Sequence, residues 1–128
     1  MELRLVLTVD DWERAVALYR DALGLPEREM WLGEDGAAKG VLLDAGSATL
    51  EVVNEAHATS IDDIEVGERV APKVRVAFRV DDSEPAAARL RESGAKLIAG
   101  PVVTPWQDKN IRLEAPDGTQ LTLFSVVD

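Results

Sequence analysis

Two arginines and one glutamate are the residues of this sequence with the clearest chemical potential. Arg4 and Arg75 begin two segments of similar sequence, and Glu51 lies between them along the chain. A guanidinium stays protonated and binds a carboxylate, a phosphate or an enolate-like oxygen through paired hydrogen bonds. A glutamate placed between two arginines would instead neutralise them within the protein. We expect a structural role for one arginine and leave anion binding open for the other.

The chain has few residues that could support chemistry based on imidazole or thiolate groups. There is no cysteine, which excludes a disulfide framework and a thiolate metal site. The single histidine, His57, lies in a polar segment and is expected to be a surface residue. No nucleophile triad, phosphate-binding glycine loop or dinucleotide fingerprint is present.

Composition sets further limits on the class of protein. The chain has 128 residues, which predicts one domain, and a net charge of −10, which disfavours nucleic acid and anionic membranes as partners. No segment approaches the roughly 18 apolar residues of a membrane span, and Arg4 interrupts the N-terminal apolar run, so we expect no signal peptide and a cytoplasmic location. A solvated charged segment is expected at four acidic residues, Asp62, Asp63, Glu65 and Glu68.

An internal repeat organises the sequence. RLVLTVDDWERAVALYR (4–20) and RVAFRVDDSEPAAARLR (75–91) share eight identities in 17 positions. Their tails, VLLDAGSATLEVV (41–53) and IRLEAPDGTQLTLF (111–124), also correspond. Two matches in the same order and at nearly the same offset indicate a duplicated module. We therefore divide the single domain into a first module (1–54), a linker (55–73) that could hold a short element, and a second module (74–128).

Each module is predicted to follow the order β-α-β-β-β. Alternating residues from Leu5 to Val9 form a strand, Asp10 and Glu13 form a capping box for the helix, and Gly24 ends that helix. In the first module, the later strands are predicted near 28–33, 39–44 and 48–54. In the second module, a strand at 75–80 and a helix at 83–93 precede strands near 96–99, 109–115 and 119–126.

Alternation also assigns faces to the first and last strand of each module. The apolar sets must cover the helices, so the opposite, mixed faces are free to line a concave cup. The residues on these mixed faces that could contact a ligand are Arg4, Thr8, Thr49, Glu51, Arg75, Arg79, Gln120 and Thr122. A merely solvated face fits the same pattern. Trp31, Trp106 and Phe124 are candidates for stacking on a planar ligand, whereas Trp12 is expected in the core.

The sequence resembles the vicinal-oxygen-chelate (glyoxalase/bleomycin resistance/dioxygenase) superfamily. The segments VDDWERAVALYRDALGLP (9–26), GSATLEVV (46–53), VRVAFRVDDSEPAAARLRESGAK (74–96) and GPVVTPWQDKNIRLEAPDGTQLTLF (100–124) carry the resemblance and cover most of the chain. It implies an α+β fold whose curved sheets form a cup, and commonly a homodimer. Members bind antibiotics, or bind a divalent metal and act as lyases, isomerases, epimerases or extradiol dioxygenases.

The four metal-ligand positions of that family fall on Arg4, Glu51, Arg75 and Thr122. Only Glu51 is of a ligand type, because a guanidinium has no lone pair to donate. We therefore expect a protein that binds a small organic, anionic or planar molecule without a metal or other cofactor, with sequestration of an antibiotic as the leading form. The alternatives are a divalent-metal enzyme that uses Glu51 with atypical ligands, and a metal-free enzyme with Glu51 as base, whose basicity the nearby arginines would weaken.

Overall fold

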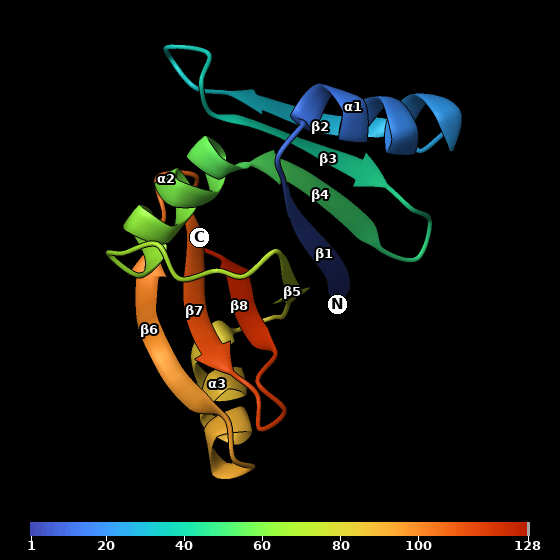
Figure 1. Cartoon of the computed structure of the whole chain (residues 1–128). Helices are drawn as coiled ribbons and strands as arrows, with labels where there is room; N and C mark the ends of the chain where they lie inside the picture. The colour runs from blue at the N-terminus through green and yellow to red at the C-terminus, as the bar shows by residue number, and fades with distance from the viewer. Residues whose placement is uncertain (128) are drawn as a thin grey trace.

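The computed structural model describes residues 1–127, and its elements follow the predicted order (Figure 1). The first module contains β1 (Glu2–Val9), α1 (Trp12–Val16), the π-helical continuation η1 (Ala17–Ala22), β2 (Glu27–Leu32), β3 (Lys39–Asp44) and β4 (Thr49–Asn54). Helix α2 (Glu55–Glu65) follows. The second module contains β5 (Val74–Arg79), α3 (Ser83–Glu92), β6 (Lys96–Val103), β7 (Asp108–Glu114) and β8 (Gln120–Val126).

All the strands belong to one mixed sheet of eight strands in the order β2-β3-β4-β1-β5-β8-β7-β6. Within each module the first strand runs parallel to the last, as β1 does to β4 and β5 to β8. The two modules join through the antiparallel pair β1–β5, in which Leu5 lies opposite Val76. The α+β fold with two β-α-β-β-β modules is therefore confirmed.

The two helices predicted from the repeat each pack on one half of the sheet. Trp12 and Val16 of α1 pack against Val41, Leu43 and other residues of the first half. The Trp12 indole also donates a hydrogen bond to the Val52 carbonyl oxygen at 2.9 Å, which satisfies its polar atom inside the core. On the second half, Ala86 and Ala87 of α3 pack against residues from β7 and β8. Hydrophobic burial on these outer faces leaves the opposite faces of the strands for a site.

The helix starts agree with the sequence in one module and differ in the other. Helix α3 begins at Ser83, as predicted, and Asp82 caps it by accepting from the Glu84 amide. For α1 the cap is Asp11 rather than Asp10, because the Asp11 carboxylate accepts from the Arg14 amide at 3.1 Å. Strand β6 is four residues longer than expected and ends at Val103 instead of residue 99, because it pairs with β7 through register shifts that preserve the ladder.

Segment 55–73 holds an 11-residue helix, α2, where the sequence had suggested only a linker with a short element. Asn54 caps α2 by accepting from the His57 amide at 3.0 Å. The helix contacts strands of both modules, and Figure 1 shows it in the angle between the two halves of the sheet. In the described part of the chain, no helix is both long and apolar enough to cross a membrane.

The expectation of a solvated acidic segment is wrong for Asp62 and Glu65. These residues are 1% and 5% exposed, and both bind Arg112 of β7. Asp62 also accepts from the Val70 and Ala71 amides at 2.8 Å. Charge alone could not reveal this burial, because the arginine that neutralises both carboxylates lies about 50 residues away along the chain.

Candidate binding pocket between the two half-sheets

A pocket of about 390 Å³ lies between the mixed faces of the two half-sheets and α2. Seven of the residues singled out from the sequence line it: Arg4, Trp31, Glu51, Arg75, Trp106, Thr122 and Phe124. Val6 and Ala77 add apolar surface from the central strands, and Ile61 adds it from α2. The repeat and the strand alternation thus brought together residues that are far apart in the sequence.

Arg4 is neutralised within the protein. Its Nη1 lies 3.3 Å from Oε1 of Glu51, and its Nε and Nη2 donate to Oε2 of Glu2 at 3.1 and 3.0 Å. The guanidinium also lies over the Phe124 ring, 5.1 Å from the centroid. Burial raises the pKa of Glu2, but the Thr49 hydroxyl and the Arg4 charge outweigh it and hold the pKa below its usual value. Arg4 therefore has the structural role expected for one of the two arginines.

Arg75 has no such counterion among the described residues 1–127. It is 7% exposed, and its Nη1 donates to the Thr122 hydroxyl at 2.8 Å. Its Nε is buried without a partner, and no carboxylate oxygen of residues 1–127 lies within 4.0 Å of its nitrogens. Burial, reinforced by repulsion from Arg112, lowers the pKa of Arg75 against the attraction of Glu65, Glu51 and Asp62, although a guanidinium remains charged at neutral pH. The expected Arg–Glu–Arg cluster is therefore only half formed, and a buried cation faces the pocket.

His57 lies in the pocket wall and is partly buried, rather than fully exposed on the surface as expected. Its imidazole stacks on the Trp31 indole, with ring centroids 5.9 Å apart and planes at 29°. Gly40 makes this position possible, because a Cβ there would lie 3.1 Å from Nε2 of His57. Burial lowers the pKa of His57; Glu51 opposes that shift and Arg75 adds to it, so the imidazole is neutral at pH 7.

Asn110 of β7 lines the pocket and Arg112 of the same strand is buried, and the face assignments had included neither residue. The Asn110 amide nitrogen donates to Oε2 of Glu65 at 3.0 Å. Arg112 donates to Asp62, Glu65 and Gln120 at 2.8 to 2.9 Å, and its side chain is fully buried. The available signal was the alternation within 109–115, because Ile111 and Leu113 belong to the core under α3.

Four residues predicted for the cup lie outside this pocket. Thr8 borders only a much smaller cavity beneath it. Thr49 is buried and donates to Glu2 at 2.7 Å, and Gln120 is held by Arg112 and the Val70 carbonyl oxygen. Arg79 is exposed at the end of β5, opposite Glu2 in the β1–β5 ladder. These positions share the inward face, but lie beyond the pocket or have their polar atoms occupied by other residues.

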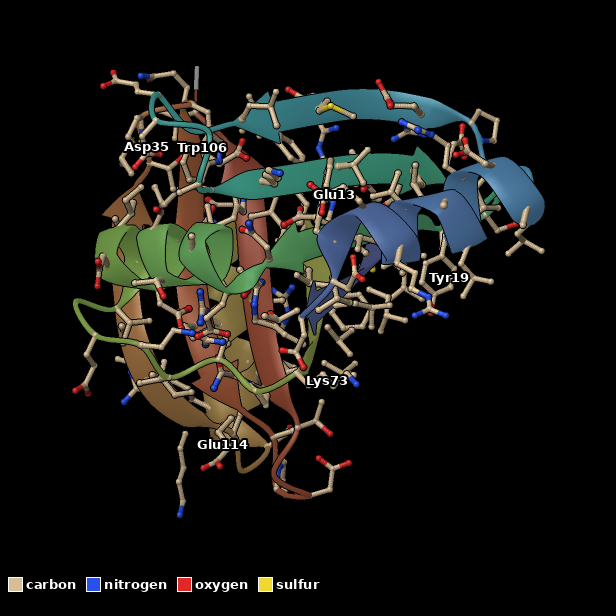
Figure 2. The ribbon with its side chains drawn as sticks, turned by 45° about the horizontal axis from the view of Figure 1, so that its top comes forward. Glu13, Tyr19, Asp35, Lys73, Trp106 and Glu114 are labelled. Atoms are coloured by element: carbon tan, nitrogen blue, oxygen red, sulfur yellow. The ribbon has the colours of Figure 1, made fainter. Side chains whose placement is uncertain are left out.

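Trp106 lies at the mouth of the pocket. It is 46% exposed and precedes β7, and Figure 2 shows it at one edge of the molecule. Asp108, two residues further on, also lines the pocket, and burial raises the pKa of its carboxyl against the lowering effect of Arg4 and Arg79. An exposed indole beside the opening offers a flat apolar surface to an entering ligand.

The donor set does not fit a divalent metal. Glu51 is the only ligand-type residue at the four family positions, and Arg4 already binds its carboxylate. Arg75 adds a second cation to the same cavity. Among residues 1–127, no three histidine, cysteine, aspartate or glutamate side chains are grouped so that they could hold a metal ion. The pocket instead combines the Arg75 guanidinium, which has no carboxylate within 4.0 Å among residues 1–127, with aromatic and apolar side chains and with the carboxylates of Glu29, Glu65 and Asp108.

Comparisons with known proteins agree with this fold. A family model described as the Glyoxalase/Bleomycin resistance protein/Dioxygenase superfamily matches residues 3–123. No curated protein matches the sequence. Among solved structures, a hypothetical protein from Bacillus halodurans C-125 aligns with a TM-score of 0.69 and 17% identity over 98% of this chain and 93% of that chain.

Two further structures have similar scores. A glyoxalase/bleomycin resistance protein/dioxygenase superfamily member from Vibrio splendidus 12B01 has a TM-score of 0.65 and 16% identity, over 97% of both chains. A variant of methylmalonyl-CoA epimerase from Streptomyces coelicolor, in complex with 2-nitronate-propionyl-CoA, has a TM-score of 0.65 and 20% identity, over 98% of this chain and 96% of that chain. At these identities the likeness shows a shared fold and no more.

Proposed function

We propose, from the premise that the chain belongs to the glyoxalase/bleomycin resistance protein/dioxygenase superfamily, that its pocket binds a small organic anion without a resident metal. Arg75 would hold the anionic group of the ligand. One observation carries this proposal: the Arg75 guanidinium lines the cavity, is largely buried and lacks a carboxylate partner among residues 1–127. A desolvated cation of this kind is stabilised by an anion that makes charge-assisted hydrogen bonds to it.

The remaining walls favour an organic anion over a bare inorganic one. Trp31, Phe124 and Trp106 contribute aromatic surface, while Val6 and Ala77 contribute aliphatic surface. A volume of about 390 Å³ falls at the lower end of the range of small-molecule sites. Sequestration of such a molecule, as in resistance proteins of this superfamily, is the function that requires nothing beyond this pocket.

Binding of matched probes tests the anion site. We expect benzoate to bind with a dissociation constant at least about 10-fold lower in the wild type than in Arg75→Met, because a charge-assisted hydrogen bond is lost. Neutral benzamide should be nearly indifferent to that change. Arg79→Met is the matched control, because it removes an arginine of the same strand that is exposed and outside the pocket. Equal benzoate affinity in wild type and Arg75→Met would contradict the proposal.

Metal analysis tests the second part of the proposal, that the pocket holds no resident metal. Purified protein is exposed to Mn²⁺, Ni²⁺, Fe²⁺ or Zn²⁺, desalted and analysed, with Glu51→Ala as the comparison. We expect no stoichiometric metal in either protein, because Arg4 occupies the Glu51 carboxylate. One metal ion per chain that is lost in Glu51→Ala would overturn the metal-free proposal and favour a metal-dependent lyase, isomerase or dioxygenase.

A further inference from the structure

We propose that His57 is the second residue that binds the anionic group of the ligand, because its imidazole donates a hydrogen bond to the anion that Arg75 holds. This inference rests on the anion site proposed above and adds a second contact to it. His57 is then a specificity-determining residue that couples binding of the anion to uptake of a proton. The four metal-ligand positions of the family do not include it.

The backbone and the ring of His57 are held in place by their neighbours. The Asn54 side chain caps α2 by accepting from the His57 amide at 3.0 Å, so His57 lies in the first turn of the helix. The imidazole stacks on Trp31, and Gly40 leaves the space that the ring occupies. A ring that is already ordered loses little further freedom when a ligand binds to it.

Both nitrogens of the imidazole are available to a ligand. No group of residues 1–127 makes a hydrogen bond with either nitrogen, and neither is closed off from solvent, in contrast to Nε of Arg75. No partner within this part of the chain therefore fixes the tautomer, so either nitrogen can carry the hydrogen. Because His57 lines the pocket, a neutral imidazole can donate its N–H to an anion there.

His57 and Arg75 lie close together. A cavity of about 10 Å³ lies beneath the pocket, and residues that border so small a space are near one another. Five residues border both cavities: Val6, Glu51, His57, Ile61 and Arg75. Nη2 of Arg75 has no hydrogen bond with residues 1–127 and is not closed off from solvent. An anion that binds this nitrogen can therefore also reach the imidazole.

The charges around His57 explain why an anion would change its protonation. Burial lowers the pKa of His57, Glu51 raises it and Arg75 lowers it. An anion on Arg75 removes that repulsion and adds attraction, so it favours the imidazolium. By reciprocity, the imidazolium binds the anion more tightly than the neutral ring does. The other acidic groups of the two cavities are Glu29 of β2, Asp108 of β7, and Asp62 and Glu65 of α2, of which the last two are paired with Arg112.

The first measurement is a proton NMR titration of the untagged protein, in which the single histidine gives one unambiguous ring signal. We expect benzoate to raise the midpoint of the His57 titration by about one pH unit, and neutral benzamide to leave it nearly unchanged. Without ligand, Arg75→Met should raise the midpoint, because it removes a repelling charge. Arg79→Met is the matched control and should leave the midpoint in place. An unchanged midpoint in Arg75→Met would contradict the closeness of the two residues.

The second measurement is the affinity for benzoate in His57→Phe, which keeps a ring on Trp31 but has no ring nitrogen. We expect binding about 5- to 10-fold weaker than in the wild type at pH 7, because one hydrogen bond to a charged group is lost. From pH 8 to pH 5.5 the wild type should bind benzoate about 3- to 5-fold more tightly, whereas His57→Phe should lack this gain. Benzoate stays ionised over this range, since a carboxyl group has an ordinary pKa of about 4.

The outcomes separate this inference from the proposed function. Benzoate binding that needs Arg75 but is equal in wild type and His57→Phe, with no change in the His57 midpoint, would overturn the role of His57 alone. Binding that needs His57 but not Arg75 would overturn the Arg75 site alone, and absence of benzoate binding would overturn both. Thermal melting shows whether His57→Phe is folded; if it is not, the midpoint measured in the wild type with and without benzoate decides the question.

Discussion

The two halves of the pocket have different side chains at equivalent positions of their strands. On β3, Leu42 lies opposite Glu51, whereas on β7 the corresponding Arg112 lies opposite Thr122. Gly40 likewise corresponds to Asn110, as their places opposite β4 and β8 show. In the first half, His57 packs against Trp31 and Gly40, whereas in the second half Asn110 lines the pocket and Arg112 is buried with Asp62 and Glu65.

The equivalent arginines show the same divergence. Arg4 has carboxylate partners in Glu2 and Glu51, while the matching partner of Arg75 is the neutral hydroxyl of Thr122. Lys73 and Thr122 occupy the positions of the second module that correspond to Glu2 and Glu51, so neither carboxylate of the Arg4 site has an acidic counterpart there. The comparison teaches that position alone does not assign a role to a residue, because the neighbours decide whether its charge is already neutralised.

The largest loss of stability is expected at Arg112, whose equivalent in the first half is the apolar Leu42. Arg112→Met leaves the buried Glu65 without its cation and Asp62 with Arg69 alone, and should lower the free energy of unfolding by about 3–5 kcal/mol. Urea denaturation measures the change. Leu42→Met, at the equivalent position of the first half, is the matched control and should cost less than about 1.5 kcal/mol. Similar losses in both variants would remove the distinction between the two halves.

Gly40→Ala tests the open wall of the first half. The added methyl group would lie 3.1 Å from Nε2 of His57 and 3.2 Å from Cε3 of Trp31, so both rings must move. We expect a loss of about 1–3 kcal/mol in unfolding free energy from this overpacking. In a double-mutant cycle, His57→Ala should relieve most of that cost. If Gly40→Ala lowers the unfolding free energy equally in the His57→Ala background, the clash is not with His57.

The variants Arg4→Met and Arg75→Met test directly whether the two equivalent arginines differ. Arg4→Met strips Glu2 and Glu51 of their cation and should cost about 1–2 kcal/mol, since these carboxylates are largely buried. Arg75→Met removes a desolvated charge that has no carboxylate partner among residues 1–127, and should leave the unfolding free energy unchanged or higher. Both are measured by urea titration. A loss at Arg75 as large as that at Arg4 would show that Arg75 is neutralised within the protein.

The smallest expected effect is a pH dependence at His57. The folded state lowers the pKa of His57 below 6.5, mainly by burial, so unfolded chains bind a proton there first as the pH falls. This contribution to stability is complete above pH 6.5 and is lost at lower pH. The stability of the wild type relative to His57→Gln should therefore decline from pH 7 to pH 5.5. A constant difference would mean that His57 titrates as in the unfolded chain.

The architecture and about half of the pocket-lining residues could be predicted from the sequence. The repeat predicted both modules, and alternation placed Arg4, Glu51, Arg75 and Thr122 on one face, since period-two patterning depends only on local geometry. It failed for α2, whose burial depends on Arg112 pairing with Asp62 and Glu65 across about 50 residues. His57 was missed for the same reason, because nothing local indicates that its helix folds back over the sheet.

The antiparallel pairing of β1 with β5 determines what a ligand titration of the pocket should show. Both walls of the pocket and its helix come from one polypeptide, so no second chain is needed to complete the cavity. Homodimer formation, which the family resemblance predicts, would then not govern occupancy. Saturation should reach one ligand per chain, and the apparent affinity should be unchanged when the protein is diluted a hundredfold.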